Sequence, residues 1–275
     1  MKKYGLLFFS VLLLFTGCDS AGEKKAGIYL RNAREALNKG EFSDAKLQID
    51  SIKILYPKAF YARREGLKLM QEVEYQEQIK TLAYLDSMLR IREKQFEEIK
   101  GNYKLEKDPE YQDTGIYFYP TQTVERNINR SFLRGQVNEQ GIMYLTSIYC
   151  GSYKINHNAV KVTAPDGTFA ETPASDDRYE SVDLGVRTEK VDYQLGNDGN
   201  VIGFIALNKD KNLRAEYLGG KKYATTISPS DRKAIAELLT LSEILTSIEQ
   251  IKKEQKEANL KLEFVKRKME EGNEG

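Results

Sequence analysis

The sequence contains few of the residues from which metal centres, disulfide frameworks and sugar-stacking surfaces are built. Among 275 residues there are two cysteines, one histidine and no tryptophan. Two cysteines and one histidine exclude a Cys/His metal site and a disulfide-stapled fold. The lack of tryptophan removes the commonest sugar-stacking platform, although tyrosines remain. We therefore expect no cofactor.

The sequence also lacks an excess of charge of either sign. Lys and Arg number 42 against 41 for Asp and Glu. A balanced charge creates no field that would attract nucleic acid, so we expect no nucleic-acid partner. With 30% charged residues, 10% aromatic residues and six prolines, the composition is that of a folded chain rich in helix.

Only one long hydrophobic run occurs, and it lies at the start of the chain. Lys2 and Lys3 precede an apolar stretch over residues 6–15. A run of this length is too short to span a bilayer as a permanent helix, since about 20 apolar residues are needed. The pattern predicts a signal peptide over residues 1–17.

The end of this segment carries a second signal. Gly17 precedes Cys18, and this pair resembles the lipobox of bacterial lipoproteins, although Phe15 stands where that family usually has Leu. The resemblance implies cleavage before Cys18 and attachment of acyl chains, such as palmitate, to that cysteine. The alternative is an ordinary secreted protein with a cysteine near its cleavage point. The small and charged residues of 18–27 predict a lipidated N-terminus followed by a flexible linker.

The lipid anchor would give the protein its location and its first partner, the membrane. We expect a protein of the bacterial cell envelope, at the outer membrane in preference to the inner one. Whether it faces the periplasm or the cell surface is left open.

Residues 28–57 have the pattern of a helical hairpin with a turn at Gly40. Bulky, small and turn-forming residues recur at positions that resemble a tetratricopeptide repeat. These are Tyr29, Ala33, Gly40, Phe42, Ala45, Ile49 and Pro57. The resemblance covers about a tenth of the chain and implies a scaffold for protein or peptide partners. A plain helical hairpin is the alternative.

Two later segments carry heptad patterns, and each predicts one long helix. The first helix is expected over 58–107 and the second over 228–271. Ser228, Pro229 and Asp231 mark the start of the second as cap, first helical residue and capping box. The two apolar seams are expected to pair with each other as an antiparallel coiled coil, and pairing between subunits is the alternative.

Between the two helices, residues 114–227 have a different composition. Glycine turns and β-branched alternation predict about eight strands, which would form an inserted all-β sandwich or barrel. The runs 142–150 and 201–207 are apolar throughout and are expected to be central strands that supply an independent core.

Residues that could carry chemistry are few. His157 lies in a polar run and is expected in an exposed loop, and Cys150 is expected to be a buried, unreactive thiol. Asp176 and Asp177 are adjacent in a polar stretch, which favours solvated side chains over an acid/base pair. The acidic and amide residues of 208–212 depart from a calcium loop and predict a hairpin turn.

These observations predict an α+β protein with a helical hairpin, a helical pair and an inserted β domain. No catalytic or metal-binding residue is assigned, and Cys18 is the one predicted modification site. The favoured function is that of a non-enzymatic, membrane-anchored envelope lipoprotein that binds another envelope protein. The alternatives are an envelope hydrolase and a glycan-binding protein, both acting through the β domain.

Overall fold

The computed structural model describes residues 18–108, 110 and 113–272. The described part is an α+β protein with five α-helices and two antiparallel sheets, so the predicted class is confirmed. The chain divides into two compact units. Unit 1 comprises residues up to 87 and those from 253, and unit 2 comprises residues 88–252. The predicted signal peptide lies outside the described residues.

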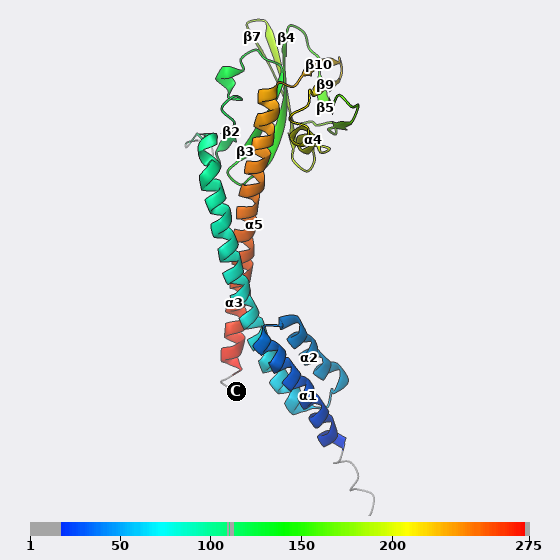
Figure 1. The fold of residues 1–275 in the computed structure, drawn as a ribbon, viewed down its shortest axis with the longest axis vertical. Helices are drawn as coiled ribbons and strands as arrows, with labels where there is room; N and C mark the ends of the chain where they lie inside the picture. Colours follow the sequence, from blue (N-terminus) through cyan, green and yellow to red (C-terminus); the bar gives the residue numbers. More distant parts are fainter. Residues whose placement is uncertain (1–17, 109, 111–112, 273–275) are drawn as a thin grey trace, which may run out of the picture. The chain divides into compact units, whose positions relative to one another are not determined.

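Unit 1 begins with a helical hairpin of α1 (Cys18–Lys39) and α2 (Phe42–Leu55), which lie side by side in Figure 1. Gly40 makes the turn with φ +73°, a left-handed conformation that glycine adopts without strain. The helix α3 (Phe60–Ile99) follows after Pro57. Small and apolar side chains from the three helices form one buried cluster, which includes Ala33, Ala45, Ile49, Ile52, Ala62 and Val73.

The stretch 18–27 is helical, so the prediction of a flexible linker there is wrong. Packing against neighbouring helices explains the difference. The side chain of Ala26 is fully buried, and the carboxylate of Glu23 accepts the backbone N–H of Tyr61 at 3.0 Å and of Ala62 at 3.1 Å. These contacts fix the first turns of α1 and cap the N-terminus of α3.

The long helix α5 (Pro229–Glu271) begins where the sequence predicts. The Ser228 hydroxyl accepts the backbone N–H of Asp231 at 3.2 Å, which confirms the predicted N-cap. In unit 1 the last part of α5 runs antiparallel to α3. There the Gln255 side-chain amide donates to Asp86 at 2.9 Å, and the Lys266 ammonium lies 5.9 Å from the centre of the Tyr75 ring.

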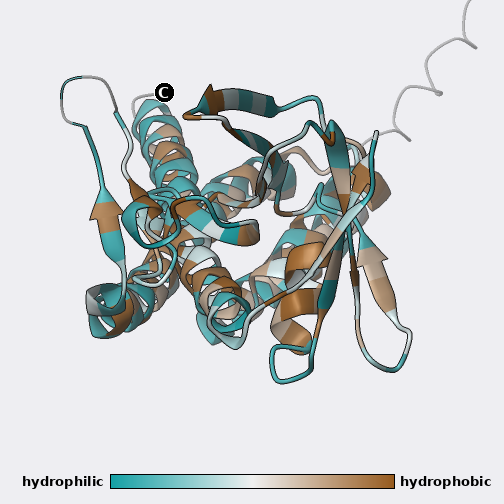
Figure 2. Cartoon of the chain, turned by 90° about the horizontal axis from the view of Figure 1, so that it is seen from above, coloured by the Kyte–Doolittle hydropathy of each residue, from teal (hydrophilic) through white to brown (hydrophobic). Residues whose placement is uncertain are grey.

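The residues marked by the heptad pattern are buried or half-buried in both helices. On α3 they are Tyr75, Gln78, Leu82, Leu85, Leu89, Arg92, Phe96 and Ile99. On α5 they are Leu241, Ile244, Ile248, Ile251, Gln255, Ala258, Leu262, Val265 and Met269. Figure 2 shows helices with hydrophobic residues on one side and hydrophilic residues on the other.

Unit 2 contains both sheets. The six-stranded sheet has the order β1 (Lys104–Glu106), β2 (Ile116–Phe118), β3 (Phe132–Asn138), β4 (Met143–Gly151), β8 (Val186–Gln194), β7 (Arg178–Asp183). The four-stranded sheet has the order β10 (Tyr223–Thr226), β9 (Arg214–Gly219), β5 (His157–Thr163), β6 (Phe169–Glu171). Short 3₁₀ helices occupy Lys100–Asn102 and Val124–Arg126. Because α3 ends at Ile99 and β1 follows, the predicted continuation of that helix to 107 is wrong.

The apolar run 201–207 forms the helix α4 (Val201–Leu207), so the predicted central strand is wrong. The preceding turn explains the change. Asn200 has φ +64°, and the Asp198 carboxylate accepts the backbone N–H of Ile202 at 2.7 Å, which satisfies a donor of the first helical turn. A short apolar run has no periodicity that separates a strand from a buried helix.

One hydrophobic core in unit 2 combines both sheets, α4 and α5 (Figure 1). Helix α5 contributes Ile235, Leu238, Leu241 and Leu245. Gly135 of β3 lies so close to α5 that a Cβ atom there would come within 2.9 Å of the Leu238 side chain. The expectation that residues 114–227 supply their own core is therefore wrong, because helix side chains complete it.

Candidate functional site

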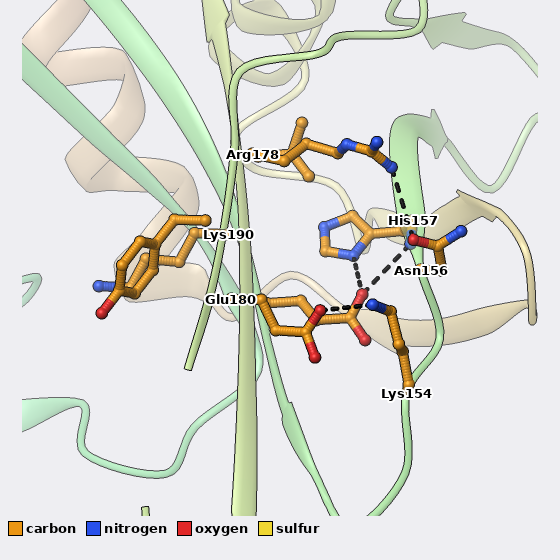
Figure 3. A pocket seen from close by; sticks show the side chains of 9 residues that line it. Lys154, Asn156, His157, Arg178, Glu180 and Lys190 are labelled. Atoms are coloured by element: carbon orange, nitrogen blue, oxygen red, sulfur yellow. Dashed lines mark hydrogen bonds and ion pairs between the residues drawn. The ribbon is translucent and has the colours of Figure 1, made fainter. Parts of the chain in front are cut away.

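A cavity of about 200 Å³ opens beside β7 and β8 in unit 2 (Figure 3). Nine residues line it: Lys154, Asn156, His157, Arg178, Tyr179, Glu180, Glu189, Lys190 and Val191. Three of these side chains are cationic and two are carboxylates, so the cavity is polar and of mixed charge.

Ion pairs and hydrogen bonds organise the rim of this cavity. The Glu180 carboxylate of β7 forms an ion pair with the Lys154 ammonium at 2.5 Å and another with Arg187 of β8. The Arg178 guanidinium donates to the Asn156 side chain at 3.5 Å. The Lys154–Glu180 and Arg178–Asn156 contacts, drawn as dashed lines in Figure 3, tie β7 to the segment between β4 and β5.

At the base of the cavity, a buried histidine connects the two sheets. His157 Nε2 lies 2.8 Å from the Ser147 hydroxyl, and Nδ1 lies 3.4 Å from the Glu189 carboxylate. The same carboxylate accepts the backbone N–H of Ile155 at 2.7 Å and of His157 at 3.3 Å. The prediction that His157 is exposed in a loop is wrong, because these partners in β4 and β8 draw it inside.

Burial lowers the pKa of His157 below its ordinary value, while the hydrogen bond with Glu189 acts in the opposite direction. The imidazole is therefore neutral at pH 7. A neutral ring that donates a hydrogen bond from Nδ1 to Glu189 can accept a hydrogen bond from the Ser147 hydroxyl at Nε2. The three side chains thus satisfy one another's hydrogen bonds within the interior.

The order serine, histidine and carboxylate is that of a hydrolase triad, but the surroundings of the serine differ from those of an active site. Ser147 is 0% exposed on a central strand, and it does not line the cavity. Its hydroxyl also lies 3.3 Å from the Tyr193 hydroxyl and 3.5 Å from the Val191 carbonyl. Because the serine is buried and hydrogen-bonded on several sides, the geometry suits a structural link between the two sheets.

The hairpin of β7 and β8 borders the cavity and has an unusual tip. Asp183 pairs with Val186, which leaves the two-residue turn Leu184-Gly185. Leu184 has φ +46° and is 98% exposed, and Gly185 has φ +81°. A two-residue turn with two positive φ angles normally carries Asn or Gly at its first position, so a fully exposed leucine there is both strained and unburied.

The outer strand of this hairpin is also exposed. β7 lies at the edge of the six-stranded sheet, and five of its six residues are exposed. Tyr179 and Val182 contribute large apolar surface to it. An edge strand offers unpaired backbone groups to an incoming strand, and apolar side chains add contact area.

The sequence prediction missed β7 because its sequence is mostly polar. An edge strand with both faces in solvent needs no apolar alternation, which is the signal by which strands are recognised. The one available signal was Gly185 between two runs of β-compatible residues.

The other sequence candidates lie apart from this site or have local roles. Cys150 is a free, half-buried thiol with Sγ 3.5 Å from the Thr188 hydroxyl. The backbone of Asp177 accepts the Asp192 N–H at 3.0 Å. Asn208 donates to the Phe204 carbonyl at 2.9 Å at the end of α4. Cys18 is the first residue of α1, and its side chain is outside the described part.

Several tyrosines from both sheets join the core instead of forming a surface. The ring centroids of Tyr149 and Tyr223 are 5.0 Å apart, and those of Tyr217 and His157 are also 5.0 Å apart. Burial raises the pKa of Tyr149 to about 12 and that of Tyr217 well above 10. These side chains pack the interior, so they offer no platform for a glycan.

Within the described ranges, no three residues of the types His, Cys, Asp and Glu are grouped so that they could hold a metal ion. Among the helices in those ranges, none combines the length and the apolarity needed to cross a membrane. Comparison of the chain with known protein families, curated proteins and solved structures finds no match.

Proposed function

We propose that this chain is a non-enzymatic, lipid-anchored protein of the bacterial envelope that binds another envelope protein through the β7–β8 hairpin. The observation that carries the proposal is Leu184, a large apolar side chain 98% exposed at a strained turn. Strained backbone and exposed apolar side chains are typical of binding sites, where a partner covers the apolar surface. The partner would be a protein segment in extended conformation.

The open edge of β7, its exposed apolar side chains and the cavity behind it all favour such a partner. An extended segment that adds to β7 gains backbone hydrogen bonds along the open edge. Leu184 and Val182 lose exposed apolar surface in the complex, which contributes about 25 cal/mol for each Å² removed from water. The polar cavity behind β7 offers Arg178 to a side chain of the incoming segment.

The anchor and the helices complete the proposal. The signal-peptide pattern and the Gly17-Cys18 pair support lipidation at Cys18. The hairpin of α1 and α2 supports a scaffold like a tetratricopeptide repeat, and the buried heptad positions of α3 and α5 support an antiparallel coiled coil. The two sheets around one core support a sandwich arrangement in unit 2.

The experiment places a photoreactive amino acid at position 184 and, as a control, at Leu207, which is also exposed in unit 2. Crosslinking in intact cells is expected to give a discrete product from position 184 and none from position 207. The variant Leu184→Asn removes the apolar side chain while its residue type suits the turn, so it is expected to fold at least as stably as the wild type.

The partner identified by crosslinking should then fail to co-purify with Leu184→Asn and should still co-purify with Leu207→Asn. If Leu184→Asn retains the partner in full yield, the hairpin is not the binding site and the proposal fails. Crosslinks that are equal at positions 184 and 207 contradict it in the same way.

One observation favours a second candidate, an envelope hydrolase. The Ser147 hydroxyl lies 2.8 Å from His157 Nε2, as a nucleophile lies beside its base. A fluorophosphonate probe distinguishes the two functions, because it labels only an accessible, activated serine. We expect no labelling of the wild type. Labelling that disappears in Ser147→Ala would establish the hydrolase and overturn the leading proposal.

A further inference from the structure

The corner between α2 and α3, residues 53–64, exposes an unusual amount of apolar surface. Ile54, Leu55, Phe60 and Tyr61 lie within these twelve residues, and their side chains are 55–73% exposed. None of the four belongs to the buried cluster of unit 1. Four large apolar groups so close together exceed the scattered exposure that is normal on a protein surface.

The corner's own sequence carries basic side chains only, while the Glu23 carboxylate of α1 lies against its backbone at Tyr61 and Ala62. Its sequence contains four basic residues and neither Asp nor Glu; the basic residues are Lys53, Lys58, Arg63 and Arg64. Among the described residues, none of these four side chains forms an ion pair. Arg63 donates to the Pro57 carbonyl at 2.7 Å, and the Arg64 guanidinium lies 5.9 Å from the centre of the Tyr61 ring.

The corner lies at the end of unit 1 from which α1 starts. The Glu23 carboxylate accepts the backbone N–H groups of Tyr61 and Ala62, so the first turns of α1 touch the start of α3. Cys18 precedes Glu23 by five residues in the same helix, which corresponds to a rise of about 7.5 Å. Any surface to which Cys18 is attached therefore lies beside the corner.

We propose that residues 53–64 dock on the membrane surface next to the lipid anchor. The apolar and aromatic side chains enter the headgroup region, and the four cations bind anionic headgroups. Aromatic residues with flanking Lys and Arg are the composition that favours this interface. The inference rests on the proposed function for the position of the anchor, and it goes further by fixing which face of unit 1 meets the bilayer.

The test uses the chain from residue 18 onward with Cys18→Ser, which keeps every other described residue and carries no lipid. Binding is measured by co-sedimentation with vesicles of phosphatidylcholine alone and of phosphatidylcholine with phosphatidylglycerol. We expect binding to the anionic vesicles that weakens as salt is raised. Phe60→Ser/Tyr61→Ser and Lys53→Gln/Lys58→Gln should each reduce the partition coefficient by roughly tenfold.

Matched control variants come from α5 within unit 1. Leu260→Ser/Phe264→Ser and Lys256→Gln/Lys261→Gln remove the same kinds of exposed side chain and should leave vesicle binding unchanged. Circular dichroism checks that all variants keep their helix content. Equal effects from corner and control variants, or no binding to anionic vesicles, would overturn the inference.

Two further outcomes are separated by the design. If the wild-type chain self-associates and only the corner variants are monomeric, the corner is an interface between copies, and the membrane inference is wrong. Failure of the anchor is detected independently, by comparing detergent partitioning of the full chain with that of Cys18→Ser. If the full chain and Cys18→Ser partition alike in detergent, Cys18 is not lipidated. Binding of the lipid-free chain to anionic vesicles through the corner would still support the membrane inference.

Discussion

The contact between Gly135 and Leu238 allows a quantitative test of how α5 completes the core of unit 2. Leu238 is fully buried, and a Cβ atom at Gly135 would lie 2.9 Å from its Cδ1 atom. Leu238→Ala removes a buried side chain and is expected to lower the free energy of unfolding by about 3 kcal/mol. For a unit of this size, that corresponds to a fall of roughly 6–12 °C in melting temperature.

Gly135→Ala alone adds a methyl group where there is no room for it. Overpacking of this kind costs about 1–3 kcal/mol. In the Leu238→Ala background the space is open, so the same methyl group should cost little or improve stability by filling the cavity. The double variant should therefore be more stable than the sum of the two single effects predicts, by about 1 kcal/mol or more.

Urea unfolding followed by circular dichroism measures all four proteins of this cycle. Gly101→Ala is the control, because no atom lies within 4 Å of a Cβ atom built there. Its effect should be small and should add to that of Leu238→Ala. A coupling energy below about 0.3 kcal/mol between positions 135 and 238 would refute the proposed contact.

Three other predictions concern the buried histidine, the seams and the anchor. The folded state lowers the pKa of His157, so as the pH falls the histidine of the unfolded chain is protonated before that of the folded chain. The free energy of unfolding should therefore be highest above about pH 6.5 and should fall as the pH drops below that value. Urea midpoints at pH 7.5 and 5 should differ less in His157→Gln, and an unchanged difference would show that other groups are responsible. Leu89→Asp and Ile251→Asp place a charge on the seams of α3 and α5, and each should lower stability by several kcal/mol at any protein concentration; a melting temperature that rises with concentration would show that the seams join subunits. The wild type should partition into detergent and Cys18→Ser into water, and equal partitioning of the two proteins would contradict lipidation.

Features with a local physical cause could be predicted from the sequence. The start of α5 depends on a hydroxyl cap, a proline and an acid within four residues, and it lies where these residues place it. The apolar run 142–150 predicted β4 (Met143–Gly151) to within one residue at each end. The turn at Gly40 was predicted for the same reason, since it depends on one glycine.

Features that depend on distant contacts were not predicted. Polar neighbours suggest a loop around His157, but its environment comes from Ser147 ten residues before it and Glu189 32 residues after it. The apolar run 201–207 predicts a strand, but the Asp198 carboxylate accepts a backbone N–H of the first turn of α4 and so stabilises a helix. The candidate binding hairpin was missed because its exposed strand lacks the apolar pattern by which strands are recognised.

The pairing order of unit 2 has a consequence for the timing of folding. β4 pairs with β8, which follows it after more than 30 residues, and the common core also needs side chains of α5 as far as Leu245. Such distant contacts make folding slow, because long loops must close before the core forms. Synthesis releases the N-terminal end first, so the core of unit 2 cannot close until Leu245 has emerged. The helical hairpin of unit 1, with its short turn, lies entirely within the 40 residues that begin with Cys18. The contacts within that hairpin are therefore complete before the core of unit 2 can close.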